Sequence, residues 1–191
     1  MKTAAAIVVG CSSGGFDALR VLLGGLDPGL SQPLLVCCHS GSETIELLCE
    51  LLGRVSPLPV IAAAERHAVR GGHVQLAPTG YHLLVEPDRR FALSTDPRVN
   101  HSRPSIDVLF ASAAVAWRET LIGVVLTGAS ADGAEGLRLV RRAGGCAIVQ
   151  SPVSARVPAM PQAALDRAGA DYCVPLADIP PLLNRLCLPR P

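Results

Sequence analysis

The stretch AAAIVVGCSSGG, residues 4–15, joins a run of apolar residues to a turn of glycine and serine. A continuous apolar run such as Ala4 to Val9 is typical of a β-strand that is buried on both faces. Apolar residues at helical spacing begin directly after the turn, between Phe16 and Leu23. A strand that leads through a glycine-rich turn into a helix predicts the first unit of a parallel α/β sheet.

The same alternation of short apolar runs and amphipathic segments continues along most of the chain. Strands are expected at residues 34–38, 121–126, 146–150 and 172–174, and helices at residues 45–52, 105–117, 134–142, 162–168 and 179–186. Residues 71–93 differ, because turns divide them into short apolar pieces that predict a hairpin or meander. The expected fold is α/β, with a doubly wound, mostly parallel sheet and helices on both faces.

Capping signals support the predicted helices. Ser42 and Ser105 are expected as the N-caps of the helices that follow them, and Asp107 adds a carboxylate to a first helical turn. Gly144 and Gly145 indicate the end of the helix at residues 134–142. With no linker or repeat in the sequence, residues 1–191 are expected to form a single domain.

Composition excludes several classes of function. The chain has 191 residues, a net charge of +1 and only 3% aromatic residues, which disfavours a nucleic-acid-binding surface. No apolar run approaches the roughly 20 residues of a membrane span, so a soluble, cytoplasmic protein is expected, with no membrane insertion. The seven cysteines include no CxxC pair. They predict small buried hydrophobes in a reducing compartment rather than a metal site, and no metal is expected.

The turn after the first strand carries a catalytic signature. Gly10-x-Ser12-x-Gly14 matches the G-x-S-x-G nucleophile elbow, in the strand–turn–helix context that this motif requires. The hydroxyl of Ser12 would then lie at the head of a helix, where the free N–H of Ser13 could stabilise an oxyanion. A phosphate or dinucleotide cradle is the alternative for such a turn, although Ser12 occupies the second glycine position of G-x-G-x-x-G.

Two more candidates follow other predicted strands. His39 follows the strand at residues 34–38, and Asp132 lies in the turn after the strand at residues 121–126. Because the carboxyl ends of parallel strands share one edge of a sheet, Ser12, His39 and Asp132 form the inventory of a nucleophile, a base and an orienting acid. Each also has a structural alternative, since His39 could be a loop histidine and Asp132 a helix cap.

The remaining histidines give weaker signals. His67, His73 and His82 lie in or near the irregular middle and are assigned no role. His101 precedes a predicted helix, where it could line the cleft or belong to a capping loop. The chain order Ser12, His39, Asp132 also differs from the Ser–Asp–His order of α/β-hydrolases, which disfavours that superfamily.

The sequence resembles the catalytic domain of the chemotaxis receptor methylesterases, the CheB family, nearly from end to end. GCSSGG at residues 10–15 is similar to the family's GASTGG, and RPSIDVLF at residues 103–110 to its RPSvDxLF. The stretch GGHVQLAP at residues 71–78, followed by His82, resembles a further family segment. LTG at residues 126–128 with DGA at residues 132–134 is similar to LTGMGxDGA, and Met160-Pro161 to GMPxxA.

The resemblance implies a function and a mechanism. By position, Ser12 would be the nucleophile, His39 the base and Asp132 the orienting acid, in the hydrolysis of glutamate methyl esters on chemoreceptor helices. It also implies an antiparallel hairpin near the active site, deamidation of receptor glutamines by some members, and no cofactor. The implied partner is the methylated cytoplasmic domain of a chemoreceptor, and an acidic receptor helix could contact surface arginines.

The sequence departs from the family pattern at several positions near the predicted site, and their effect on activity stays open. Ala129-Ser130 stands where the family has Met-Gly. The resemblance implies that this loop, together with Met160, helps to form the oxyanion hole. Serine in place of glycine could restrict that loop, since glycine tolerates positive φ. Ala159 replaces a glycine, and Cys38 replaces the usual glutamine before the histidine.

Three alternatives remain open. The chain could be a catalytically weak binding module for methylated receptors or a signalling partner, a methylesterase of another chemosensory pathway, or a nucleotide-binding module. The family's phosphorylatable receiver domain has no counterpart in this sequence. Constitutive activity, or control by a separate regulatory protein, is therefore expected, with no response of the rate to acetyl phosphate.

Overall fold

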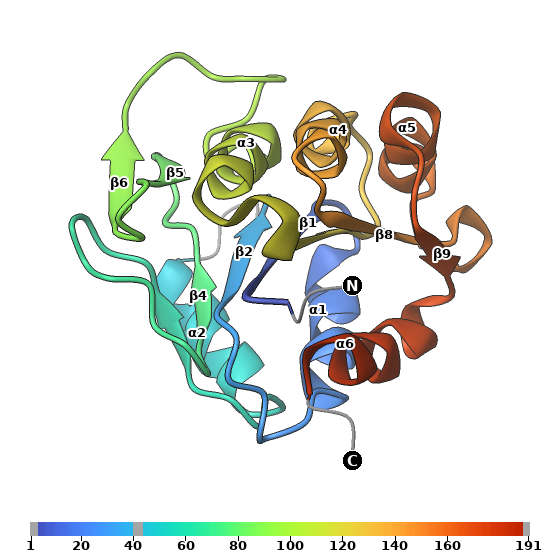
Figure 1. Ribbon diagram of the computed structural model, residues 1–191, viewed down its shortest axis with the longest axis horizontal. Coiled ribbons are helices and arrows are strands. Elements are labelled where there is room, and N and C mark those ends of the chain that lie inside the picture. The colour runs from blue at the N-terminus through green and yellow to red at the C-terminus, as the bar shows by residue number, and fades with distance from the viewer. Residues whose placement is uncertain (1–3, 40–43, 189–191) are drawn as a thin grey trace.

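A computed structural model describes residues 4–39 and 44–188. In these residues seven parallel strands form one sheet in the order β3-β4-β2-β1-β7-β8-β9, and β5 and β6 form a separate antiparallel hairpin (Figure 1). The strands are β1 (Ala6–Cys11), β2 (Leu34–Cys38), β3 (Val60–Ala62), β4 (Val74–Leu76), β5 (His82–Val85), β6 (Phe91–Ser94), β7 (Leu121–Val125), β8 (Cys146–Gln150) and β9 (Tyr172–Val174). The predicted α/β fold with a parallel sheet is confirmed.

Helices cover both faces of this sheet. They are α1 (Gly15–Gly24), α2 (Ile45–Gly53), α3 (Ile106–Trp117), α4 (Ala134–Arg142), α5 (Ala159–Ala168) and α6 (Ile179–Cys187). Figure 1 shows α1, α2 and α6 on one side of the sheet and α3, α4 and α5 on the other. The hairpin β5–β6 lies beside α3.

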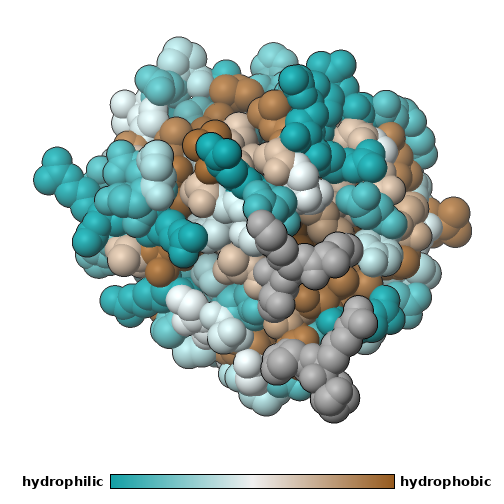
Figure 2. Space-filling model, viewed as in Figure 1, coloured by the Kyte–Doolittle hydropathy of each residue, from teal (hydrophilic) through white to brown (hydrophobic). Residues whose placement is uncertain are grey.

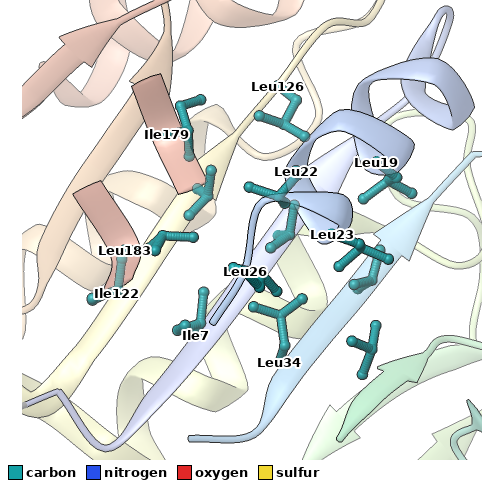
Figure 3. Packing of buried hydrophobic residues seen from close by; sticks show 14 of the residues in the cluster. Ile7, Leu19, Leu22, Leu23, Leu26, Leu34, Ile122, Leu126, Ile179 and Leu183 are labelled. Carbon is teal, nitrogen blue, oxygen red and sulfur yellow. The ribbon is translucent and has the colours of Figure 1, made fainter. Parts of the chain in front are cut away.

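Each face of the sheet has its own apolar core. On one face, Leu19, Leu22 and Leu23 of α1 pack over Ile7 and the neighbouring strands, as Figure 3 shows. On the other face the core is formed by α3, α4, α5 and the hairpin. Every residue of β1 is buried, which explains why this strand reads as a continuous apolar run rather than an alternating one.

Three parts of the fold differ from the sequence-based expectation. Residues 74–76 belong to the parallel sheet as β4, paired with β2, and only the later pieces of the middle form the hairpin. The edge strand β3 was not expected, because its residues are only partly buried and show no clear pattern. In addition, β1 extends to Cys11 instead of ending at Val9, since Gly10 and Cys11 still pair with Cys37 and Cys38.

The helix ends also refine the predictions. Ser42 lies outside the described residues, and the N-cap of α2 is Thr44, whose hydroxyl accepts a hydrogen bond from the Leu47 N–H at 3.3 Å. Gly144, with φ +87°, follows the end of α4 as the pattern indicated. The helix α5 begins before the expected residue 162, because Pro161 falls in its first turn, where an N–H needs no partner within the helix.

No disulfide joins the cysteines within the described residues, and most of them are buried or partly buried. Burial raises the pKa of Cys37 well above its ordinary value, which makes that thiol inert. Cys173 is the exposed exception to the predicted burial.

The outer surface mixes polar and apolar side chains. The face in Figure 2 alternates between hydrophilic and hydrophobic residues. The large exposed apolar side chains come from separate elements, and scattered single residues of this kind are ordinary. No helix in residues 4–39 and 44–188 is both long and apolar enough to cross a membrane.

Candidate active site at the carboxyl edge of the sheet

The position of β1 between β2 and β7 brings the ends of these three strands together. The His39 N–H donates to the Cys11 carbonyl at 3.0 Å, and the Ser12 N–H donates to the Thr127 carbonyl at 3.0 Å. These backbone bonds hold the residues after β1, β2 and β7 at the same edge. Ser12, His39 and the loop that leads to Asp132 therefore share one end of the sheet.

The turn that carries Ser12 is tight and leads directly into α1. The Ser12 carbonyl accepts from the Gly15 N–H at 2.6 Å, and Gly14 adopts the left-handed conformation with φ +78°. A Cβ on Gly10 would lie 2.3 Å from Ile106 Cγ2, so only glycine lets α3 approach this closely. No side chain of the described residues caps α1. Apart from the Gly15 N–H, which donates to the Ser12 carbonyl, its first N–H groups are therefore available beside Ser12 and Ser13.

Asp132 is the most strongly bound polar residue of the site. Its side chain is fully buried and accepts from the Ser105 hydroxyl at 2.8 Å and the Asn100 amide at 3.1 Å. It also accepts from the backbone N–H groups of Ile106 at 2.8 Å and Asp107 at 3.1 Å. The carboxylate of Asp132 thus caps α3 from another part of the chain. Ser105 occupies the expected N-cap position but makes no side-chain cap, because its hydroxyl is directed to Asp132.

His39 approaches Asp132 through one ring nitrogen. Nε2 lies 3.0 Å from Asp132 Oδ2, and the His39 side chain is 15% exposed. The contact lacks ideal hydrogen-bond geometry, and buried Nε2 has no hydrogen-bond partner elsewhere in the described chain. Catalytic hydrogen bonds are often poorly aligned before substrate binds. The other nitrogen, Nδ1, is 3.4 Å from the Ser102 hydroxyl.

The electrostatics of Asp132 favour its charged form. Burial raises the pKa of this carboxyl, but the interaction with His39 and the hydrogen bonds from Ile106, Asp107 and Asn100 outweigh burial and lower the pKa below its usual value. A carboxylate that stays ionised can hold an imidazole in one tautomer and stabilise an imidazolium.

A second carboxylate supports the first. Asp107 accepts from the backbone N–H groups of Gly133 at 2.9 Å and Gly136 at 2.6 Å. Burial and, to a smaller extent, the negative charge of Asp132 raise the pKa of Asp107. The hydrogen bond from the Gly136 N–H opposes this rise, and the resulting pKa is above its usual value. Asn100 bridges the two acids, since its amide also donates to Asp107 at 2.8 Å.

The segment that includes Asn100 is conformationally unusual. Asn100 and His101 both have positive φ, 50° and 63°. They lie between Val99 and Ser102, which exchange two backbone hydrogen bonds. From the sequence, Ser105 was expected only as a helix N-cap within the segment at residues 103–110 that resembles the family. Asn100 and Ser102 were assigned no role. The available signal was an asparagine in a turn, a residue type that tolerates positive φ.

The other predicted residues are Ser13 in the turn after β1, Ala129 and Ser130 in the loop after β7, and Met160 in α5. Ser13 and Ala129 are exposed, and the Ser130 hydroxyl accepts weakly from the Asp132 N–H at 3.4 Å. Neither Ala129 nor Ser130 has a positive φ; in this loop Gly133 does, at 96°. Met160 is buried, packs against Gly128 and donates its N–H to the Gly128 carbonyl at 2.9 Å, so it supports the loop from behind.

His82 has a structural task that the sequence did not reveal. It is 2% exposed, its Nδ1 accepts from the Ser105 N–H at 3.2 Å, and its Nε2 lies 3.1 Å from the Pro97 carbonyl. It thereby ties the hairpin to the start of α3.

A cavity of about 120 Å³ adjoins His39. Its lining residues come from the end of β2 and from two loops: Cys38, His39, Thr79, Arg98, His101, Ser102, Arg103 and Pro104. His101 therefore lines a cleft beside the site. In the described part of the chain, no group of three or more His, Cys, Asp or Glu residues could hold a metal ion.

Relatives share this fold and sequence. "Putative protein-glutamate methylesterase/protein-glutamine glutaminase" of Leptospira interrogans is 39% identical over 181 residues, which are 95% of this chain and 94% of that protein. "Protein-glutamate methylesterase/protein-glutamine glutaminase" of Symbiobacterium thermophilum is 35% identical over 179 residues, 94% of this chain and 49% of its own length. The chain thus spans nearly all of the first relative and about half of the second.

A solved structure and a family model agree with these relatives. The crystal structure of the Thermotoga maritima CheB methylesterase catalytic domain matches with a TM-score of 0.91 and 29% identity, over 96% of this chain and 99% of that one. The family model described as CheB methylesterase matches residues 7–183. The chain belongs to the CheB methylesterase family.

Proposed function

We propose that this chain hydrolyses the methyl esters of glutamate side chains on the cytoplasmic helices of a chemoreceptor, with Ser12, His39 and Asp132 as its catalytic residues. The observation that carries the proposal is the 3.0 Å contact between His39 Nε2 and the fully buried Asp132, at the sheet edge where Ser12 begins the turn into α1. Membership of the CheB family supplies the class of substrate.

The first half-reaction forms an acyl-enzyme. The Ser12 hydroxyl attacks the ester carbonyl, and His39 accepts its proton. Because Nε2 faces Asp132, Nδ1 is the nitrogen that takes this proton. The tetrahedral intermediate then expels methoxide, which leaves as methanol with the proton from His39.

The second half-reaction restores the enzyme. Water gives a proton to His39 and attacks the acyl carbon, and Ser12 leaves with that proton. The products are a receptor glutamate and free Ser12. In this proposal the Ser13 N–H and free N–H groups of the first turn of α1 stabilise the oxyanion of both intermediates. With a glutamine substrate the same steps would release ammonia, as the double names of the relatives suggest.

The test is methanol release from a fully methylated chemoreceptor cytoplasmic domain. We expect Ser12→Ala to lower the rate by at least about 10⁴-fold. Ser102→Ala is the matched control, because Ser102 is the serine whose hydroxyl lies 3.4 Å from His39 Nδ1. It should retain most of the activity.

The outcomes separate the alternatives. If Ser102→Ala abolishes release and Ser12→Ala does not, the assignment of the nucleophile is wrong. If the folded wild type releases no methanol but hydrolyses p-nitrophenyl acetate through Ser12, the substrate is wrong. If it does neither, the chain is a binding module.

A further inference from the structure

The cavity beside His39 is lined by positive and polar groups. Arg98 and Arg103 carry permanent charges, His39 and His101 add imidazole rings, and none of the described residues that line the cavity is acidic. A volume of about 120 Å³ exceeds the roughly 30 Å³ share of one water molecule, so the end of a polar side chain would fit.

Arg103 is held in place without a counter-ion from the described part of the chain. Its Nη1 donates to the Thr95 carbonyl at 2.6 Å and the Asp96 carbonyl at 3.0 Å. Its Nε is buried and lacks a hydrogen-bond partner in the part of the chain that the structure describes. Burying part of a guanidinium without a negative partner is unfavourable, and the charge of an anion in the cavity would offset that cost without contacting the buried Nε itself.

Arg98 likewise has no counter-ion among the residues that the structure describes. Its Nη1 makes a long contact of 3.5 Å with the His101 carbonyl. No ion pair joins Arg98 or Arg103 to a carboxylate within residues 4–39 and 44–188, whereas Arg156 pairs with Asp17. The two cavity arginines are therefore available to a ligand, and their planar guanidinium groups match a carboxylate.

We propose that this cavity is a subsite for a carboxylate side chain of the substrate protein, one that lies a few residues from the esterified glutamate. The inference rests on the proposed function and adds a substrate preference to it. A methyl ester is neutral, so the reacting group itself gains no ion pair from the two arginines. An acidic neighbour would gain one, and it would hold the ester beside His39 while doing so.

The test uses binding, so that it does not depend on turnover. Peptides with one glutamate γ-methyl ester would carry a single glutamate at one to four residues on either side, and the parent peptide would have glutamine at all these positions. Calorimetry with the Ser12→Ala protein gives the Kd of each. At least one placement should bind about tenfold more tightly than the parent.

Variants of the two cavity arginines test whether the preference for an acidic neighbour depends on the cavity. Arg98→Gln should reduce the tenfold preference to less than twofold, and 0.5 M salt should weaken it. Arg103→Lys, which keeps the charge and loses the fork geometry, should reduce it in part. Arg142→Gln, an exposed position at the end of α4, is the control and should leave the preference unchanged.

Three results would overturn the proposal. One is equal affinity for all the peptides, and another is a preference that persists in Arg98→Gln. The third is tighter binding of the hydrolysed parent peptide than of its ester, abolished by Arg98→Gln, because the cavity would then hold the product carboxylate. Failure of the proposed function is distinct, since it would appear as no methanol release from any peptide by wild-type protein.

Discussion

The proposed acid and the proposed nucleophile of this site lie in opposite kinds of environment. Asp132 is fully buried and accepts hydrogen bonds from Ser105, Ile106, Asp107 and Asn100. Ser12 lies on a partly exposed turn that is fixed through backbone bonds. Under the proposed function, the scaffold's polar contacts orient Asp132 and His39, while Ser12 stays open to a large protein substrate.

The sharpest test of this contrast is Asp132→Asn. We expect a loss of activity of about 10⁴-fold, as when an orienting acid is removed from other triads. Unlike Ser12→Ala, this change should also lower the free energy of unfolding by about 2–4 kcal/mol, because several donors lose a charged acceptor. Methanol release and urea unfolding of both variants measure the two effects. Equal stability of the two variants would show that Asp132 does not anchor the fold.

A smaller effect is expected at Asn100, which we interpret as a positioning residue. Asn100→Ala and Asn100→Gly both remove the amide that bridges Asp132 and Asp107. Each should lower kcat about tenfold with little change in KM, because orientation of the acid is lost and substrate contacts are kept.

The two Asn100 variants should differ in stability, because only glycine adopts a positive φ without strain. Alanine at φ 50° should cost about 1 kcal/mol more stability than glycine, which thermal unfolding would detect. If Asn100→Gly keeps full activity while Asn100→Ala loses it, backbone strain and not the amide explains the effect.

The two acids should also influence acid stability in opposite directions. The lowered pKa of Asp132 adds stability that is present above its unfolded pKa, near 4, and is lost as the pH falls through the folded value. Burial raises the pKa of Asp107, so its contribution to stability declines as the pH rises from the unfolded to the folded value.

Urea midpoints between pH 3 and pH 6 test these signs. Asp107→Asn should steepen the loss of stability on acidification, and Asp132→Asn should flatten it. The reverse order of the two slopes would show that the assigned pKa directions are wrong.

The same contrast explains what the sequence could predict. Strands such as β2 and β8 were identified in full, because a buried strand is a local apolar run. Ser12, His39 and Asp132 could be placed at one edge because parallel strands share their carboxyl ends. The shell around Asp132 could not be predicted, since Asn100 and Ser105 reach it across a loop that has no periodicity. A local capping rule assigned Ser105 to its own helix, whereas a carboxylate from the loop after β7 caps that helix instead.

The smallest effect is expected at Ser130, where the family has glycine. Serine would restrict the proposed oxyanion loop only if position 130 needed a positive φ. In the structure the φ of Ser130 is not positive. Its hydroxyl makes only the weak 3.4 Å contact with the Asp132 N–H. Ser130→Gly should therefore change kcat/KM by less than about twofold and lower stability by about 0.5–1 kcal/mol through added backbone freedom. A tenfold gain in methanol release would instead show that serine limits the loop during catalysis and that the nucleophile side is less open than its exposure indicates.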